Sequence, residues 1–239
     1  MLRPAVLART ALFAALVGVT APSTALAASV SVKGKCYVAY PPNSEQASYG
    51  EPIPVEVEEL TPGRQVKLTL EVKGTLTSSS PMLTADRRGN LVTDLTNWTT
   101  GMGNGPTKAS DARMVVRDFW LGTELGSASL QVANVAALID GDLMLNSVKR
   151  RWYISGLSEI SKRNGYYAHY YLPSGKKVGR QYLGTTQDRC GFLRAKRYTF
   201  PGGKNEFPDK FDIRIQASPT FTSDEPFVEY RFYKVIMGA

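Results

Sequence analysis

The feature that most constrains the fold of this 239-residue chain is a strict alternation of apolar and polar side chains. In the segment Gln65–Lys73, apolar residues at 66, 68, 70 and 72 would occupy one face and polar residues the other. A period of two is typical of a β-strand with one face in a core and one in water. The same pattern predicts strands at residues 54–58, 129–132, 211–215 and 228–232.

Turn-forming residues separate these strands at short intervals, as in Thr61-Pro62-Gly63, Arg88-Gly89-Asn90, Leu121-Gly122-Thr123 and Pro201-Gly202-Gly203. After the N-terminal region, no segment has a helical period of useful length. Short strands joined by Gly- and Pro-containing turns are typical of sandwiches and barrels. The sequence therefore predicts an all-β fold.

The first 27 residues have the three parts of a cleavable signal peptide. Arg3 and Arg9 make the start positive, residues 11–19 are apolar, and Ala25-Leu26-Ala27 supplies small residues before a cleavage point. The apolar run is too short to span a bilayer, which takes roughly 20 residues. We expect a secreted, extracellular chain that begins at Ala28, has no transmembrane segment and could associate non-covalently with the cell surface. A short N-terminal membrane anchor is the alternative.

The mature chain is long enough for two small domains, since domains typically run to about 100–150 residues. We place the boundary near residues 137–142, where one apolar strand ends and a new apolar segment begins. The expected organisation is a signal peptide (1–27), a first β-sandwich domain (28–141) and a second one (142–239).

Charge divides along the same boundary. Residues 28–141 contain 10 Lys and Arg against 12 Asp and Glu, whereas residues 142–239 contain 17 against 9, a net charge of +8. A basic half on an exported protein suits an anionic partner such as a wall polymer or an acidic glycan. A charge excess that only keeps the protein soluble is an equal alternative.

Short motifs resemble a known class of secreted protein. The segment Leu83-Thr84-Ala85-Asp86-Arg87-Arg88-Gly89-Asn90-Leu91 is similar to the Ala-Asp-x-x-Gly hairpin of bacterial immunoglobulin-like (Ig-like) repeats. Cys36-Tyr37-Val38, Tyr167-Ala168-His169-Tyr170 and Arg189-Cys190-Gly191 resemble a tandem Ig-like secreted family of actinobacteria. The resemblance implies two Ig-like sandwiches and export, and it implies no particular activity.

The two cysteines, Cys36 and Cys190, predict one disulfide, because exported proteins fold in oxidising compartments. Such a bridge would tie the start of the first domain to the second domain. Two free buried thiols are the alternative. A redox role is not expected, because neither cysteine has the close partner that such chemistry needs.

Catalysis is not expected, and we predict that the protein is not an enzyme. His169 is the sole histidine, and no Gly-x-Ser-x-Gly motif presents a nucleophile. One histidine and two distant cysteines do not make a zinc site, so no metal and no cofactor are predicted. A carboxylate-dependent hydrolase using Glu206, Asp209 and Asp212 remains an alternative. We expect Trp98, Trp120 and Trp152 to be core anchors.

The candidate ligand-binding surface is an aromatic and basic strand pair in the second domain. Alternation should place Ala168, Tyr170 and Leu172 in the core, leaving the intervening residues outward. Aromatic faces could stack on sugar rings, and cations would suit an anionic polymer. Ordinary cross-strand pairing of tyrosines explains the same residues and is the interpretation we favour. The candidate residues are Tyr167, His169, Tyr171, Lys176, Lys177 and Arg180.

Together these features predict a non-enzymatic binding or structural protein of the cell envelope. Its second domain would contact an anionic cell-wall polymer or glycan. No nucleic-acid motif is present, and nucleic acid is not an expected partner. A protein–protein adhesion module that uses an exposed sheet edge is another alternative.

Overall fold

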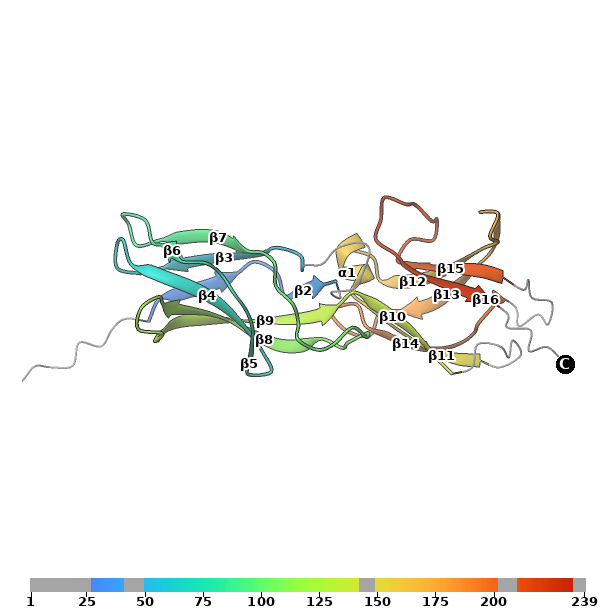
Figure 1. Cartoon of the computed structure of the whole chain (residues 1–239), viewed down its shortest axis with the longest axis horizontal. Helices are drawn as coiled ribbons and strands as arrows, with labels where there is room; N and C mark the ends of the chain where they lie inside the picture. Colours follow the sequence, from blue (N-terminus) through green and yellow to red (C-terminus); the bar gives the residue numbers. More distant parts are fainter. Residues whose placement is uncertain (1–26, 41–49, 142–148, 202–209, 234–239) are drawn as a thin grey trace, which may run out of the picture.

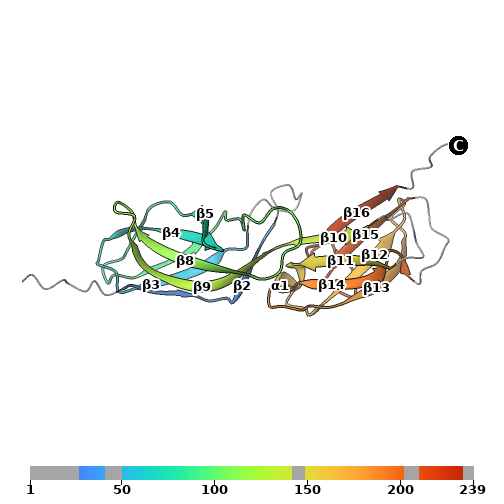
Figure 2. The same ribbon diagram turned by 90° about the horizontal axis from the view of Figure 1, so that it is seen from below.

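The computed structural model describes residues 27–40, 50–141, 149–201 and 210–233. The signal-peptide prediction therefore lies almost entirely outside the described residues. Strands dominate the rest of the chain, and they form two units placed end to end in one elongated body (Figures 1 and 2). The all-β prediction is confirmed.

The first unit packs two sheets against each other. One has the strand order β1-β3-β7, and the other has the order β2-β9-β8-β4-β5, with β6 also paired to β4. All pairs are antiparallel except β2 with β9, which run parallel. The strands are β1 (Ser29–Val32), β2 (Cys36–Ala39), β3 (Ile53–Glu58), β4 (Gln65–Val72), β5 (Thr75–Ser79), β6 (Leu83–Thr84), β7 (Leu91–Leu95), β8 (Ser110–Asp118) and β9 (Glu124–Asn134).

The second unit is also built from two sheets, and all of its pairs are antiparallel. The strand orders are β10-β11-β14 and β13-β12-β15-β16. A short helix, α1 (Leu157–Ser161), connects β11 to β12 and ends at Lys162 in a left-handed conformation. The strands are β10 (Ala136–Asp140), β11 (Lys149–Ser155), β12 (Gly165–Tyr171), β13 (Lys177–Thr185), β14 (Leu193–Tyr198), β15 (Lys210–Gln216) and β16 (Val228–Tyr233).

The alternating sequences form the predicted strands because their apolar faces fill the two cores. In β4, Val66, Leu68 and Leu70 are fully buried, as the two-residue period predicted. Burying such a side chain contributes roughly 1.5–3 kcal/mol. The other four predicted strands lie within β3, β9, β15 and β16. Trp98 anchors the first core and Trp152 the second, both fully buried, as predicted.

The predicted Ala-Asp-x-x-Gly turn connects β6 to β7. The carboxylate of Asp86 accepts hydrogen bonds from the backbone N–H groups of Arg88 (2.7 Å) and Asn90 (2.8 Å). These bonds lower the pKa of Asp86. Gly89 has φ 81°, and a Cβ there would lie 2.0 Å from the carbonyl oxygen of Leu60. Glycine is therefore required for both conformation and space.

Strand β2 lies at the junction and contributes to both cores. Tyr37 and Ala39 pack in the core of the first unit, while Cys36 and Val38 pack in that of the second. Successive side chains of a strand point to opposite faces, so one short strand can serve two cores. The packing of β2 therefore joins the two units, in addition to the chain connection between β9 and β10.

The predicted boundary at residues 141–142 does not follow the sheets. The apolar strand that was expected to end near residues 137–142 divides instead at Val135. β9 belongs to the first unit, whereas β10 pairs with β11 in the second. Val135 and Ile139 are already part of the second core. We therefore propose that the boundary between the two units lies at Val135.

Candidate functional site

The predicted binding residues on β12 lie on the face that alternation assigned to them. Tyr166, Ala168 and Tyr170 are fully buried in the core of the second unit. Tyr167, His169 and Tyr171 point away from that core, and across the sheet His169 pairs with Arg180 of β13 and Arg214 of β15. Lys176 lies in the turn before β13, and Lys177 begins that strand.

This face is not open, because residues 217–227 fold over part of it. We call these residues the covering segment. Phe221 packs edge-on against His169 and against Tyr171, with ring centroids 5.6 Å apart in each case. The guanidinium of Arg214 lies 4.8 Å from the centre of the Tyr171 ring and 5.2 Å from that of Phe221. The aromatic residues therefore form a small second core on the outer side of the sheet.

Polar contacts hold the covering segment in place. The side chain of Gln216 donates to the carbonyl oxygens of Thr222 (2.7 Å) and Glu225 (3.0 Å) and accepts from the Thr222 N–H (3.2 Å). Arg180 donates to the Pro219 carbonyl oxygen at 2.6 Å. Gln216 is fully buried, so these bonds satisfy an amide that would otherwise be costly to bury.

His169 is fully buried, so the expectation that it faces solvent is wrong. Its Nε2 lies 3.0 Å from the carbonyl oxygen of Ser218, to which it donates. Burial lowers the pKa of His169 to about 4, and the positive charges of Lys177 and Arg180 add to that effect, against the opposing hydrogen bond to Ser218. The imidazole is therefore neutral at neutral pH and takes part in packing.

The solvent-accessible part of the predicted site is smaller and more basic than expected. Lys176, Lys177 and Arg180 are exposed. The guanidinium of Arg180 lies 5.7 Å from the centre of the Tyr167 ring, which packs against Tyr182 at 5.1 Å. The structure thus brings Arg180 together with Tyr167, while His169 and most of Tyr171 lie beneath the covering segment.

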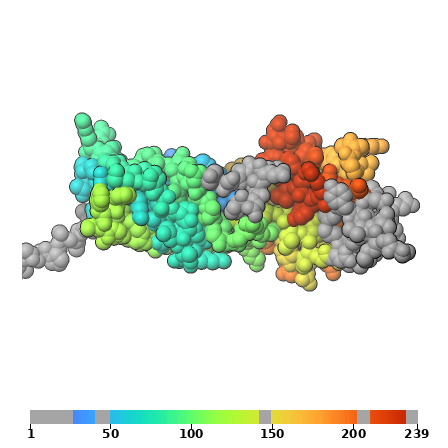
Figure 3. Space-filling view, in the orientation of Figure 1, coloured from blue at the N-terminus to red at the C-terminus, as the bar shows by residue number. Residues whose placement is uncertain are grey.

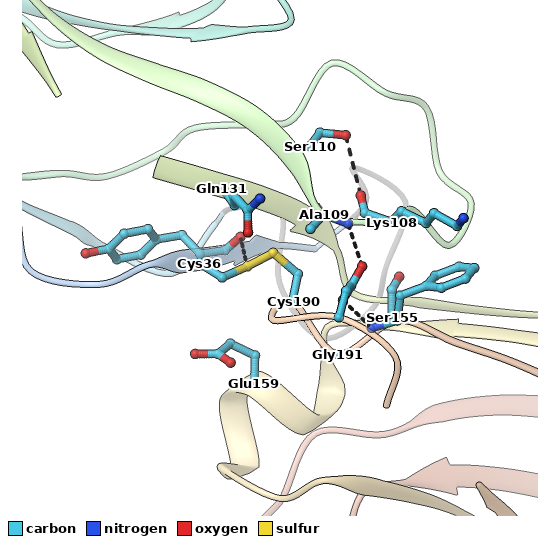
Figure 4. The surroundings of a disulfide bond; sticks show 12 residues. Cys36, Lys108, Ala109, Ser110, Gln131, Ser155, Glu159, Cys190 and Gly191 are labelled. Carbon is cyan, nitrogen blue, oxygen red and sulfur yellow. Dashed lines mark hydrogen bonds between the residues drawn. A yellow bond between two sulfur atoms is a disulfide. The ribbon is translucent and has the colours of Figure 1, made fainter. Parts of the chain in front are cut away.

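The predicted disulfide between Cys36 and Cys190 is present, with the two Cα atoms 5.5 Å apart (Figure 4). It joins β2 to the loop between β13 and β14 across 154 residues of sequence. The carbonyl oxygen of Cys190 accepts from the Gly156 N–H at 3.1 Å. The bridge therefore fixes the two units at their contact. The described chain holds no free cysteine.

The buried Asn134 makes several hydrogen bonds at the junction between the two units. Asn134 donates from its side chain to the carbonyl oxygens of Gly103 (2.6 Å) and Gly105 (3.1 Å), and it accepts from Thr100 (2.5 Å). Its backbone carbonyl accepts from the hydroxyl of Ser155 in the second unit (2.5 Å). In the same region, the Ala109 N–H donates to Asp188 at 2.8 Å. Hydrogen bonds therefore join the two units at the junction in addition to the disulfide.

Carboxylates near surface hollows have structural partners. A hollow of about 300 Å³ is bordered by Glu159 and Asp188. The two oxygens of Asp188 accept backbone N–H bonds from Phe192 and Ala109, and Glu159 pairs with Lys162. Within the described ranges, no three His, Cys, Asp or Glu side chains gather as a metal site would require. Glu206 and Asp209 of the alternative hydrolase site lie outside the described residues.

Trp120 is 75% exposed, so its predicted role as a core anchor is wrong. It lies in the β8–β9 turn beside Leu121, which is 74% exposed. The Asp118 carboxylate accepts the backbone N–H groups of both residues, at 3.0 and 2.8 Å. The Trp120 indole donates to Gln65 at 2.7 Å. The turn therefore presents two ordered apolar side chains to solvent.

Comparison with known proteins gives no family. No protein-family model matches the chain, and no curated protein matches it. Among solved structures, it is similar to a tetra-tandem repeat from the extending region of a large adhesion protein (13% identity, TM-score 0.27), covering 86% of this chain and 47% of that one. This chain thus spans about half of that repeat structure.

Two further solved structures resemble the chain to a similar degree. A two-domain fibronectin type III segment of chicken tenascin is 6% identical, with a TM-score of 0.26 and coverage of 86% of this chain and 97% of that one. A Mobiluncus mulieris adhesin is 9% identical, with a TM-score of 0.29 and coverage of 79% and 78%. Among the described residues, no helix is long and apolar enough to cross a membrane.

Proposed function

We propose that the chain is an exported, non-enzymatic binding or structural protein of the cell envelope. It would consist of two tandem Ig-like sandwiches whose basic second unit contacts an anionic surface polymer or glycan. The observation that carries this proposal is the Cys36–Cys190 disulfide, which locks the two units together at their junction. Disulfides persist in oxidising, extracellular compartments, so this bridge supports an exported protein.

The arrangement of charge supports the second half of the proposal. The net charge of residues 142–239 is +8, against −2 for residues 28–141. The exposed cations Lys176, Lys177 and Arg180 lie around the β12–β13 turn. Because exposed charges attract counter-charges over roughly 10 Å at 0.1 M salt, such a unit would concentrate an anionic polymer at its surface.

Co-sedimentation with purified cell walls tests this proposal. The mature chain 28–239 should pellet with the walls at low salt and remain in solution at high salt, because salt screens exposed charges. The triple variant K176E/K177E/R180E should bind more weakly, because it reverses three exposed positive charges of the second unit. The matched control is K35E/R87E/R88E, which changes the net charge equally on exposed cations of the first unit. Wild-type protein that stays in solution at every salt concentration contradicts the proposal.

A further inference from the structure

A second set of cations lies on the outer face of the sheet β10-β11-β14. On β11 and β14, these side chains alternate with Trp152 and Leu193, which are buried in the core. Side chains at intervening positions must point to the opposite side of the sheet. In Figure 3, part of β11 is visible in yellow at the lower surface of the second unit. The cross-strand pairs are Lys149 with Tyr198, Arg151 with Lys196, and Tyr153 with Arg194, which we together call the basic sheet face.

Positive charge dominates the basic sheet face. Its four cations are exposed, and among the described residues an Asp140 carboxylate on β10 lies 4.0 Å from Arg151. That pair is exposed, with side-chain exposures of 58% and 53%, so it contributes little. On the β4–β8 sheet of the first unit, by contrast, Glu71 pairs with both Arg113 and Arg117.

One pair on the basic sheet face works against the stability of the fold. Arg151 and Lys196 lie directly opposite each other on neighbouring antiparallel strands. Like charges in that position destabilise a sheet, because nearby cross-strand side chains repel. An anion bound between them would relieve this repulsion. The pair therefore destabilises the unbound sheet and would be stabilised by a bound anionic ligand.

The tyrosines hold the outer two cations in place. The ammonium of Lys149 lies 5.3 Å from the centre of the Tyr198 ring, and the guanidinium of Arg194 lies 5.7 Å from that of Tyr153. Cation–π contacts of this kind restrict long, flexible side chains. Because less entropy is then lost when a ligand binds, the basic sheet face is preorganised for anions.

We propose that the basic sheet face binds a linear acidic polysaccharide. This inference rests on the proposed function and moves the main contact from the β12–β13 turn to the opposite sheet. Same-face residues of a strand are roughly 7 Å apart and neighbouring strands roughly 5 Å apart, so the cations form a flat, regular array. Such an array matches an extended polymer with repeated carboxylates. The half-buried tyrosines add aromatic surface and hydroxyl groups suited to sugars.

Binding to polygalacturonate, an acidic polysaccharide, tests this proposal with the mature chain 28–239. The variant R151Q/K196Q should bind at least about tenfold more weakly, because two charge-assisted contacts are lost. Its thermal midpoint should be unchanged or higher, since a repulsive pair has been removed. The matched control K176Q/K177Q removes the same charge from the same unit and should retain most of the binding. Neutral dextran should not bind.

Other results would overturn the proposal. Equal weakening by R151Q/K196Q and K176Q/K177Q would show that only net charge matters. Tighter wild-type binding to double-stranded DNA or to phosphatidylglycerol vesicles would contradict an acidic polysaccharide as the partner. If wild-type protein binds cell walls and R151Q/K196Q binds them equally well, this inference fails while the proposed function stands. If polygalacturonate behaves as expected and walls do not bind, the proposed function fails and the inference stands.

Discussion

Cys36 and Cys190 join a strand that belongs to two hydrophobic cores to a loop of the second unit. Cys36 is on β2, whose alternate side chains pack in each core, and Cys190 follows β13. The disulfide thus lies at a place where the two units share a packed strand. This relationship joins the two units by a covalent bond at a place where they also pack against each other.

Removing the disulfide should lower the stability of the whole chain. For C36S/C190S we expect a loss of about 2–5 kcal/mol in the free energy of unfolding, because the bridge restricts a loop of 154 residues in the unfolded chain. Chemical denaturation of oxidised wild type and of the variant measures this difference. Under non-reducing conditions, the wild type should take up no thiol-alkylating reagent in mass spectrometry. Two alkylated cysteines would contradict the account.

Replacing Asn134 should loosen the junction without removing the disulfide. N134A leaves the Gly103 and Gly105 carbonyl oxygens and the Thr100 hydroxyl without their partner. Thr100 is buried, so its hydroxyl is left unsatisfied, whereas Gly103 and Gly105 are exposed and their carbonyl oxygens can bind water. One unsatisfied buried polar group costs about 1–3 kcal/mol, and we expect a loss of that size. Hydrogen exchange should accelerate in residues 100–109. Q131A, a less buried residue on the same strand, is the control and should leave that exchange unchanged.

The stability of the chain should fall as the pH drops from about 6.5 to about 4, and His169 should contribute to that fall. Its folded pKa of about 4 lies below its ordinary value of 6.5, so the unfolded state binds a proton more readily in this window. Protonation therefore favours unfolding, by an amount on the order of 2 kcal/mol at the acid end. Urea unfolding at several pH values measures it.

The variant H169Q isolates this effect. Glutamine can still donate to the Ser218 carbonyl oxygen but does not titrate, so the pH dependence should be shallower than in the wild type. The pH series should be run in constant salt, because Lys177 and Arg180 also act on the imidazole. An identical pH dependence in both proteins would show that His169 is not buried as a neutral group.

Trp120 should dominate the solvent-accessible fluorescence of the folded protein. Trp98 and Trp152 are fully buried, whereas Trp120 is 75% exposed. W120F should therefore shift the emission to shorter wavelength and remove most quenching by iodide, with little change in stability. A surface substitution of this kind usually changes stability by about 0.5 kcal/mol or less. Persistent iodide quenching in W120F would contradict the exposed position of this side chain.

The sequence predicted features that depend on local patterns. The alternation in residues 65–73 is sufficient for a strand because pleating alone sends successive side chains to opposite faces. The turn at Asp86 and Gly89 follows from the hydrogen-bonding side chain of one residue and the conformational freedom of the other. The disulfide followed from the number of cysteines and the expected compartment.

Features that depend on distant contacts were not predicted. The burial of His169 requires the covering segment, and no local pattern in residues 217–227 links them to β12. No turn-forming Gly or Pro interrupts residues 129–139, so the change of sheet at Val135 is visible only in the strand pairing. Trp120 was predicted to lie in the core, although it directly precedes the predicted turn at 121–123 and turns usually lie at the surface. The basic sheet face did have a partial sequence signal, because cations and a tyrosine recur at every second position of 149–153 and of 194–198. Arg150 and Arg197 at intervening positions obscure that pattern.

The most direct test of the account compares wild type, K176E/K177E/R180E, R151Q/K196Q and the first-unit control K35E/R87E/R88E in one wall-binding assay at low salt. Circular dichroism should first show that all four proteins are folded. The account predicts that wild type and the first-unit control pellet with the walls and are released by salt, whereas both second-unit variants bind more weakly. Wild type that does not pellet, or binding lost only in the first-unit control, would contradict it.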